Sequence, residues 1–482
     1  MTQEVLINVA PRETRIALVA EGRLRELFIE REDRQSLLGN IYMGRVSKIL
    51  SNANAAFVDC GLERSAFLSA NDARPSGQSH NNRVEISGLV QEGAEVMVQV
   101  VKEPIGGKGA RVRCRIALAG RYLVFMPKGD AINISRRLTD TAERERLTAL
   151  INDVIEPQDG VIIRTVSSGI DSSDLAADLL RLKERWKDIQ MASSRVTAPS
   201  CVYTDLEPVL RNLRDRLTFS IDSVFIDDRV TFSSAQGFCQ QFMPEFVDRL
   251  ELLATPGSAF DDYELEQQIE DMLVPEVRLR SGGTLYFEEA QSMTVIDVNT
   301  AGFKGTSNRA ATILRTNIEA ACEVAWQLRL RNIGGLVVID FINMDSSDSR
   351  AKVFTELEAA LSKDSTRVHL TNFSELGLVE LTRTRTRESY SHGITEWCEY
   401  CQGLGRVKTA DAIATEILRS LSHGTRAEPG RDFSVVASPE VVAILDGQER
   451  AALEDLEYKA AATFELVSDS DLEREVFEVV PL

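Results

Sequence analysis

The sequence predicts a multidomain protein of mixed α/β and α+β class, and three observations lead to that prediction. The 482 residues are enough for about three domains. A compact all-β texture begins at Gly39, and two apolar runs that each end in aspartate flank a helical segment between residues 283 and 344. The net charge of −19, from 55 basic and 74 acidic residues, argues against indiscriminate nucleic-acid binding, so any nucleic-acid site must be local.

The first hundred residues read as two different β segments. Residues 5–29 alternate polar and apolar side chains around Glu21-Gly22, which predicts strands joined by a hairpin turn. From residue 39 to residue 100, short strands with periodic glycines predict a small Greek-key barrel of the oligonucleotide-binding class.

Three aromatic residues and one lysine give that barrel a possible binding face. We expect Tyr42, Phe57 and Phe67 to stack on bases, and Lys108 to contact a phosphate. For Phe57, which stands between alanine and valine, a place in the core is an equally good interpretation.

A strand over residues 160–165 ends in Arg164 and Thr165, a pair of side chains able to hold a phosphate. By itself this signal is weak. The alternative is that Arg164 ends a buried strand and pairs with a nearby acid such as Asp159 or Asp171. A helix is expected over residues 173–191, followed by further strand and helix material over 210–275.

The two aspartate-ended runs carry the most chemistry. Asp297 and Asp340 each end a β-branched strand, and a helix is expected between them, over residues 309–331. Strand, helix and strand form a βαβ unit, so the strands should be parallel neighbours with both carboxylates at one sheet edge. Two such carboxylates suit Mg²⁺, and Asn299 lies on the same face as Asp297. The alternative is that the acids cap loops or pair with arginines.

Basic residues surround these acids in the sequence and favour the metal interpretation. Arg383, Arg385 and Arg387 alternate, so an extended chain would point all three the same way. Acids that hold a metal within a ring of cations suit a phosphodiester substrate. The other basic residues of this predicted ring are Lys304, Arg309, Arg315, Arg329 and Arg331.

Cys398 and Cys401 form a CxxC followed by glycines, the only close pair among seven cysteines. A structural zinc site needs four ligands. Either His392 and another group complete the site within the chain, or two chains each give a pair across a two-fold axis. Thioredoxin-like redox chemistry is a rival, but no strand-to-helix context for the CxxC is visible. The segment 407–482 reads as a small α+β unit, with a helix over 411–421, a strand over 433–437 and a helix after Ser438-Pro439.

Scattered cysteines and the absence of a secretory signal or an apolar span lead us to expect a cytoplasmic protein.

Taken together, several motifs resemble the ribonuclease E/G family over the whole chain. They are Ile296-Asp-Val-Asn-Thr300, Leu328-Arg-Leu-Arg-Asn-Ile-Gly-Gly-Leu336, Ile339-Asp-Phe341, Leu376-Gly-Leu-Val-Glu-Leu381, Arg385-Thr-Arg-Glu-Ser389 and the CxxC. The short tail after the CxxC is similar to family members that lack a long disordered scaffold.

The resemblance implies an RNase H-like domain interrupted by an S1 barrel and a 5′ sensor, then a DNase I-like catalytic domain, a zinc link and a small α+β domain. The implied bounds are 1–37 and 210–275 for the RNase H-like parts, 38–115 for the barrel, 116–209 for the sensor, 276–395 for the catalytic domain, 396–406 for the link and 407–482 for the last domain.

The activity that the resemblance implies is magnesium-dependent, single-strand-specific endoribonuclease activity in ribosomal RNA maturation and messenger RNA decay. It implies a preference for 5′-monophosphorylated RNA and products with 5′-phosphate and 3′-hydroxyl ends. The resemblance also implies the site residues, carried over by motif. Asp297 and Asp340 would hold Mg²⁺ and Asn299 would support the scissile phosphate, while Phe57, Phe67 and Lys108 would bind RNA. Arg164, Thr165 and the backbone at Val124 would bind the 5′-phosphate, and Cys398 and Cys401 would give half of a Zn²⁺ site in a homodimer.

Two other classes of function compete with this one. A non-catalytic RNA-binding module with a zinc clip would need the barrel and the cysteines, but it has no reason to place aspartates on two adjacent parallel strands. A redox protein that uses Cys398 and Cys401 predicts thiol turnover and no metal.

Overall fold

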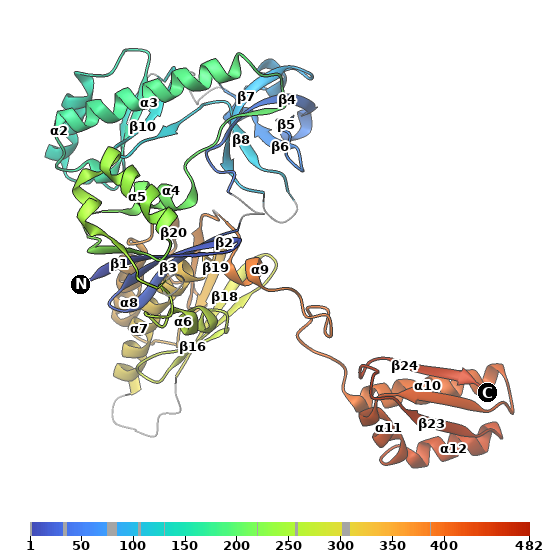
Figure 1. Cartoon of the computed structure of the whole chain (residues 1–482). Coiled ribbons are helices and arrows are strands. Elements are labelled where there is room, and N and C mark those ends of the chain that lie inside the picture. The colour runs from blue at the N-terminus through green and yellow to red at the C-terminus, as the bar shows by residue number, and fades with distance from the viewer. Residues whose placement is uncertain are drawn as a thin grey trace. The chain divides into compact units, whose positions relative to one another are not determined.

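A computed structural model describes residues 2–31, 36–74, 84–104, 108–129, 131–218, 220–255, 259–300, 309–385 and 387–482. The chain divides into two units, residues 1–393 and 394–482 (Figure 1). In the described part of the chain, five sheets form the framework, four in the first unit and one in the second. Among the described residues, none of the helices combines the length and apolar character that crossing a bilayer would need.

The first sheet joins the start of the chain to residues more than two hundred positions later. Its strand order is β15-β14-β1-β2-β3, with β1, β2 and β3 antiparallel and with β14 parallel to both β1 and β15. The elements are β1 (Gln3–Ala10), β2 (Glu13–Ala20), β3 (Arg23–Arg31), α4 (Pro208–Arg216), β14 (Ser223–Ile226), α5 (Arg229–Phe242), β15 (Leu250–Leu252) and α6 (Leu265–Asp271). The residues between β3 and α4 are therefore an insertion into this fold.

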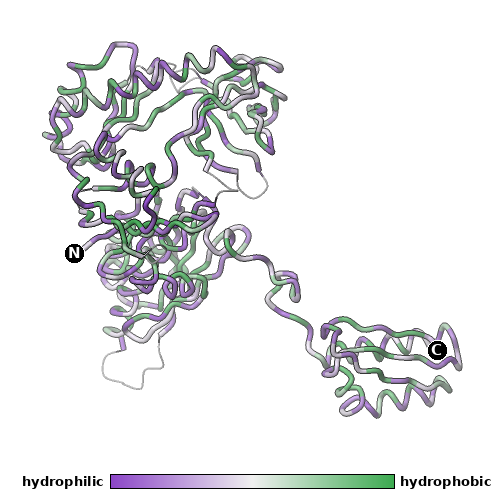
Figure 2. The backbone as a smooth tube through the Cα atoms, in the orientation of Figure 1, coloured by the Kyte–Doolittle hydropathy of each residue, from purple (hydrophilic) through white to green (hydrophobic). Residues whose placement is uncertain are grey.

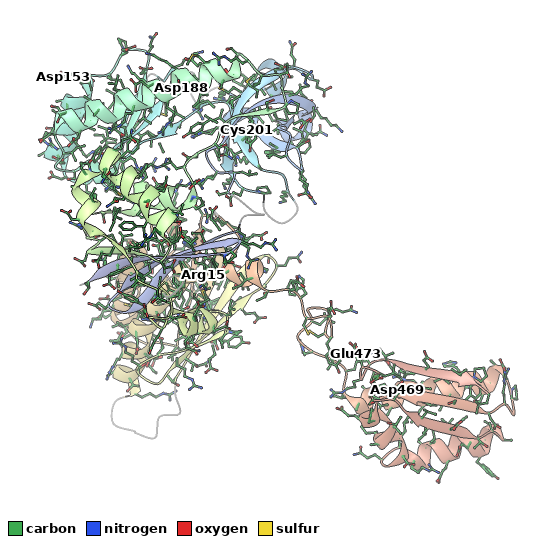
Figure 3. The ribbon with its side chains drawn as sticks, in the orientation of Figure 1. Arg15, Asp153, Asp188, Cys201, Asp469 and Glu473 are labelled. Carbon is green, nitrogen blue, oxygen red and sulfur yellow. The ribbon has the colours of Figure 1, made fainter. Side chains whose placement is uncertain are left out.

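Both faces of the first sheet are covered. One face packs on residues of α4 and α5, and the other on α6 and the end of α7 (Arg309–Leu330). Arg15 on β2 (Figure 3) secures α6, because its guanidinium lies 2.8 Å from Glu266 and its Cζ lies 4.4 Å from the ring centre of Phe260.

The insertion begins with the predicted barrel. Five strands, β4, β5, β6, β8 and β7, close on themselves through the β4–β7 pairing, and β13 extends the sheet beside β4. The elements are β4 (Ile41–Leu50), β5 (Ala55–Asp59), β6 (Ala66–Ser69), α1 (Ala70–Ala73), β7 (Glu95–Lys102), β8 (Arg111–Arg113) and β13 (Ser200–Tyr203). A Cβ at Gly44 would lie 2.5 Å from Val58 Cγ1, so the barrel closes only with glycine there. The prediction of a small closed barrel is confirmed.

A four-stranded sheet with order β11-β12-β10-β9 follows, covered by α3. Its elements are β9 (Leu118–Ala119), β10 (Leu123–Met126), β11 (Ile132–Ile134), α2 (Thr141–Asn152), β12 (Gly160–Ile163) and α3 (Ser172–Ser193). Hydropathy alternates along α3, as expected for a helix with one buried side (Figure 2). The helix predicted over residues 173–191 is confirmed to within two residues at each end.

The fourth sheet of the first unit has the order β16-β17-β18-β19-β21-β20. Its elements besides α7 are β16 (Glu276–Arg278), β17 (Thr284–Glu289), β18 (Met293–Asn299), β19 (Gly335–Asp340), α8 (Ser347–Leu361), β20 (Val368–Leu370), β21 (Leu378–Arg383) and α9 (Tyr390–Ile394). Apolar residues of α7 and α8 pack on one face only. Gly334 and Gly335 follow α7: Gly335 has φ +104°, and a Cβ at Gly334 would lie 2.9 Å from the Arg385 backbone.

The second unit is a three-stranded sheet, order β23-β22-β24, with helices around it. The parallel partner of β22 is β23, and the antiparallel partner is β24. Its elements are α10 (Ala410–Ala427), β22 (Phe433–Ala437), α11 (Pro439–Asp446), α12 (Arg450–Ala460), β23 (Phe464–Ser468) and β24 (Phe477–Pro481). The predicted strand over 433–437 and the helix after Ser438-Pro439 are confirmed, and the helix predicted over 411–421 extends to Ala427.

Candidate active site and RNA-binding surfaces

Asp297 and Asp340 lie side by side at the ends of neighbouring strands. Strands β18 and β19 are parallel, and their register places Asp297 directly beside Asp340. Backbones of neighbouring strands run about 4.8 Å apart, so the two carboxylates share one small area. The prediction that these strands are parallel neighbours, with both acids at one edge, is confirmed.

The strand alternation leaves both carboxylates exposed. Ile296, Val298 and Ile339 are buried against α7 and α8, and the residues between them face the opposite side of the sheet. On that open face Asn299 donates a hydrogen bond from Nδ2 to Asp297 Oδ2 at 2.6 Å. The site is therefore two aspartates, one of them oriented by an amide, on a surface that a substrate can reach.

This donor set fits Mg²⁺. Among the residues that the structure describes, no group of three or more His, Cys, Asp or Glu side chains is placed to hold a metal ion. A closed protein cage is therefore absent from the described part of the chain. Mg²⁺ commonly takes one or two carboxylates and completes its shell with water and substrate phosphate, which is what an exposed aspartate pair can offer.

The predicted ring of arginines around the acids is wrong for the residues that can be checked. Arg383 is 5 % exposed on the helix-covered face, where its Nε donates to Asp364 at 2.8 Å. Arg385 donates to the carbonyl of Gly334, and Arg387 to Glu30. The three side chains therefore support the fold and do not point together at a substrate.

The remaining basic residues do not complete that ring either. Arg331 is buried, donates to Gln327 and to the Val274 carbonyl, and lies over the Phe287 ring. Arg309, Arg315 and Arg329 belong to α7, which covers the face opposite the acids. Lys304 lies outside the described residues.

On the barrel, Phe57 and Phe67 form an aromatic pair. They face each other across β5 and β6, with ring centres 6.3 Å apart and planes at 72°. Both are half-buried, and neither belongs to the barrel core. Tyr42, which we had expected to stack on bases, is a core residue at 5 % exposure. Lys108 is exposed. Two residues further on, the carbonyl of Ala110 accepts a hydrogen bond from the N–H of Phe67, so Lys108 is near the aromatic pair in the chain path.

Arg164 and Thr165 line the same cavity, of about 980 Å³, whose other lining residues come from the sheet-and-helix segment after the barrel and from residues 215–245. The Nη2 of Arg164 donates to Asp215 Oδ1 at 2.8 Å, and Nη1 donates to the Gly120 carbonyl. Thr165 Oγ1 lies 2.8 Å from Ser135 Oγ. Arg164 therefore pairs with an acid, as the alternative interpretation predicted. The acid is Asp215 and not Asp159 or Asp171.

Asp215 also has a second arginine partner. Arg214 donates to it from Nε and Nη2, both at 3.0 Å. Burial raises the pKa of the Asp215 carboxyl, but the hydrogen bonds and charges of Arg214 and Arg164 outweigh burial and bring the pKa below its usual value. The lowered pKa favours the ionised form of Asp215, and this effect does not depend on Arg164 alone.

Two features of this segment differ from the sequence picture. Val124 lies in β10, between β9 and β12, and pairs with Ala119 and Ile162. It lines a separate cavity, of about 350 Å³. Sequence reasoning missed Arg121, which lines the larger cavity with Arg164. Its guanidinium donates to carbonyls of Arg214 and Leu217, and no local pattern signals contacts that distant in the chain.

The cysteine pair lies in a turn before α10. Cys398 is exposed, and the N–H of Gly405 donates to Cys401 Sγ at 3.4 Å. That hydrogen bond lowers the pKa of Cys401, which favours the thiolate that zinc requires. His392, in the first unit, contacts Ser389 Oγ at 2.8 Å and lies 3.6 Å from Glu289.

Comparison with known proteins gives two matching family models. Residues 117–386 match the Ribonuclease E/G family, and residues 397–481 match the RNase E/G thioredoxin-like domain. The chain is 41 % identical over 487 aligned positions to Ribonuclease G of Salmonella typhimurium and 40 % to Ribonuclease G of Escherichia coli K12, each covering all of both chains. It is 33 % identical to Ribonuclease E of E. coli K12 over 94 % of this chain and 44 % of that protein.

Proposed function

The chain belongs to the ribonuclease E/G family, and we propose that it is a magnesium-dependent endoribonuclease that cuts single-stranded RNA. We further propose that it acts in ribosomal RNA maturation and messenger RNA decay in the cytoplasm. The observation that carries this proposal is the exposed pair Asp297 and Asp340, in register on parallel strands.

In this proposal Asp297 and Asp340 would hold Mg²⁺, which when bound supplies charge neutralisation and Lewis acidity at the scissile phosphate. The hydrogen bond from Asn299 fixes the Asp297 carboxylate, and the second N–H of that amide is available to a phosphate oxygen. Both carboxylates and Asn299 are exposed, so RNA and water would approach them from the open sheet face. Attack of water on the phosphorus, with cleavage of the bond to the 3′ oxygen and protonation of that oxygen, leaves 5′-phosphate and 3′-hydroxyl ends.

The domain bounds implied by the family are part of the same proposal. The RNase H-like domain would comprise residues 1–37 and 210–275, whose strands share one sheet. The other proposed domains are the S1 barrel (38–115), the 5′ sensor (116–209), the DNase I-like catalytic domain (276–395), the zinc link (396–406) and the small terminal domain (407–482).

We propose that Phe57, Phe67 and Lys108 anchor RNA on the barrel. Phe57→Ala or Phe67→Ala should raise KM for a single-stranded RNA by about tenfold with kcat little changed, because stacking on one aromatic ring contributes about 1–3 kcal/mol per base. Steady-state kinetics and fluorescence anisotropy measure this. Tyr458→Ala, which removes an aromatic side chain that is 88 % exposed in the second unit, is the control. An unchanged KM in both barrel variants would contradict the assignment.

We propose that Arg164 and Thr165, which line one cavity, bind a 5′-monophosphate; Val124 lines a different cavity and is left out of this proposal. Arg164→Ala should slow cleavage of 5′-monophosphorylated RNA by about tenfold, the effect of losing one charge-assisted contact. Cleavage of 5′-hydroxyl RNA of the same sequence should stay nearly unchanged. Because Arg214 remains bonded to Asp215, the variant leaves that carboxylate paired and should fold.

Arg146→Ala is the matched control, since Arg146 is an ion-paired arginine of the same segment, bonded to Glu143 at 2.7 Å. Equal slowing of both substrates by Arg164→Ala would make Arg164 a general structural or RNA contact. The sensor assignment would then be withdrawn.

One assay separates the proposed function from its rivals. Purified protein is incubated with 5′-monophosphorylated single-stranded RNA, with and without Mg²⁺. Cleavage only with Mg²⁺ supports the proposal, whereas binding without cleavage would favour a non-catalytic RNA-binding module. A redox role predicts thiol turnover, but Cys398 and Cys401 lie outside any helix or strand, between α9 and α10, and not at a strand-to-helix junction, which speaks against it.

A further inference from the structure

Asn317 on α7 is wholly buried (0 % exposed), and its side-chain amide forms hydrogen bonds with the backbone just after Asp340. Its Nδ2 donates to the carbonyl of Ile342 at 2.8 Å, and its Oδ1 accepts from the N–H of the same residue at 3.1 Å. Ile342 follows Asp340 by two residues, just beyond the end of β19. One buried side chain therefore bonds both backbone polar groups of Ile342, two residues after Asp340.

Its neighbours on α7 hold the adjoining strand ends. Glu319 accepts from the N–H groups of Arg280 at 2.6 Å and Ser281 at 3.0 Å, in the turn that leads into β17. Thr316, buried next to Asn317, packs under that turn: a Cβ at Gly283 would lie 2.9 Å from Thr316 Cγ2 and 2.7 Å from the Asn299 carbonyl. One stretch of α7 thus contacts the turn that leads into β17 and the residue that follows the end of β19.

We propose that Asn317 is a positioning residue that sets the spacing of Asp340 and Asp297 for the metal ion. This inference rests on the proposed function, because it takes the aspartate pair as the metal site. The side chain does not reach the open face, since it lies beneath the sheet on the helix-covered side. Its effect on the metal must therefore act through the backbone between Asp340 and Ile342.

An amide is the side chain that this position requires. Leucine fills a similar space but leaves the N–H and C=O of Ile342 without partners in a buried place. Aspartate keeps the acceptor for the Ile342 N–H, but as a carboxylate it faces the Ile342 carbonyl with a second acceptor. A protonated aspartate donates to that carbonyl and restores both hydrogen bonds.

The test compares Asn317→Leu with Gln327→Leu. Gln327 is a buried amide on the same helix with two hydrogen bonds, to Glu323 at 2.9 Å and from Arg331 at 2.8 Å, and neither partner follows Asp340 in the chain. Mn²⁺ affinity is measured without RNA by electron paramagnetic resonance titration, alongside kcat, KM and Tm.

Asn317→Leu should weaken Mn²⁺ binding and lower kcat by about tenfold or more, with KM for RNA nearly unchanged, as expected for loss of support behind a metal ligand. Gln327→Leu should lower Tm but leave Mn²⁺ affinity and kcat as in the wild type. If both variants lower Tm and neither changes Mn²⁺ affinity, Asn317 is only structural and the inference is overturned.

Asn317→Asp covers the case in which the leucine variant does not fold. The ratio of wild-type to variant Mn²⁺ affinity should shrink as the pH falls from about 8 to about 6, because burial raises the pKa of the new carboxyl and its neutral form restores the hydrogen bond. A ratio of one at every pH would overturn the inference. If Asp297→Asn leaves Mn²⁺ binding intact, the metal site itself is wrong, and the inference falls with it.

Discussion

Asp297→Asn and Asp340→Asn are each expected to lower kcat by on the order of a thousandfold, about 4 kcal/mol of transition-state stabilisation. Each substitution removes one of the two negative charges that the proposed Mg²⁺ site has, while the shape of the side chain is kept. RNA affinity should change little, because the proposed stacking surface at Phe57 and Phe67 lies on the barrel and not on the catalytic sheet. Single-turnover cleavage and equilibrium binding of the same RNA measure the two effects.

The control for that prediction is Glu380→Gln on β21. Glu380 is exposed on the same open face as the aspartates, opposite Val338 of β19, so its removal changes the charge of the face without changing the pair. It should keep most of the activity. A thousandfold loss in this variant too would mean that the face acts through its total charge. Products with 2′,3′-cyclic phosphate ends would exclude an external water as nucleophile.

We propose that Cys398 and Cys401 give half of a zinc site shared by two chains, so Cys398→Ser combined with Cys401→Ser is expected to release zinc and to weaken dimerisation. Four thiolates satisfy a tetrahedral Zn²⁺, so a site shared by two chains predicts about one zinc per two chains in the wild type and none in the variant. Metal analysis and light scattering measure content and mass. The barrel and the aspartate sheet belong to the other unit, so the unfolding of residues 1–393 should keep its Tm.

Cys322→Ser is the matched control, because Cys322 is also an exposed, free cysteine but lies on α7. It should leave zinc content and mass unchanged. A full zinc per chain in the wild type would contradict the shared site and favour an internal one that uses His392. A dimer that survives loss of zinc would place the subunit contact elsewhere.

The parts of the site that sequence reasoning predicted are those fixed by local pattern. Asp297 and Asp340 could be placed together because a strand, a helix and a strand in succession leave few topologies. The alternation of buried and exposed residues also predicted that Asn299 shares a face with Asp297. The closed barrel followed from short strands and glycines, and the helix over 309–331 from its apolar spacing.

What failed depends on contacts between residues far apart in the chain. The three alternating arginines suggested one cationic surface, but Arg383 pairs with Asp364 and Arg387 pairs with Glu30. Only the fold brings these acids close to the arginines. That Arg164 pairs with an acid was one of the expectations, but its partner Asp215 could not be named from the sequence for the same reason. Tyr42 is an aromatic residue in a barrel strand like Phe57, and only the packing decides that one is core and the other is not.

The pairing of β1 with β14 affects how the protein folds while it is being synthesised. Glu4 lies opposite Ser223, so one edge of the first sheet has no partner until that part of the chain has left the ribosome. At about 5–20 residues per second, the nearly two hundred residues between β3 and β14 take roughly 10–40 s to synthesise. Throughout that interval the nascent chain carries an open strand edge, the kind of surface that invites pairing with other chains and that chaperones shield.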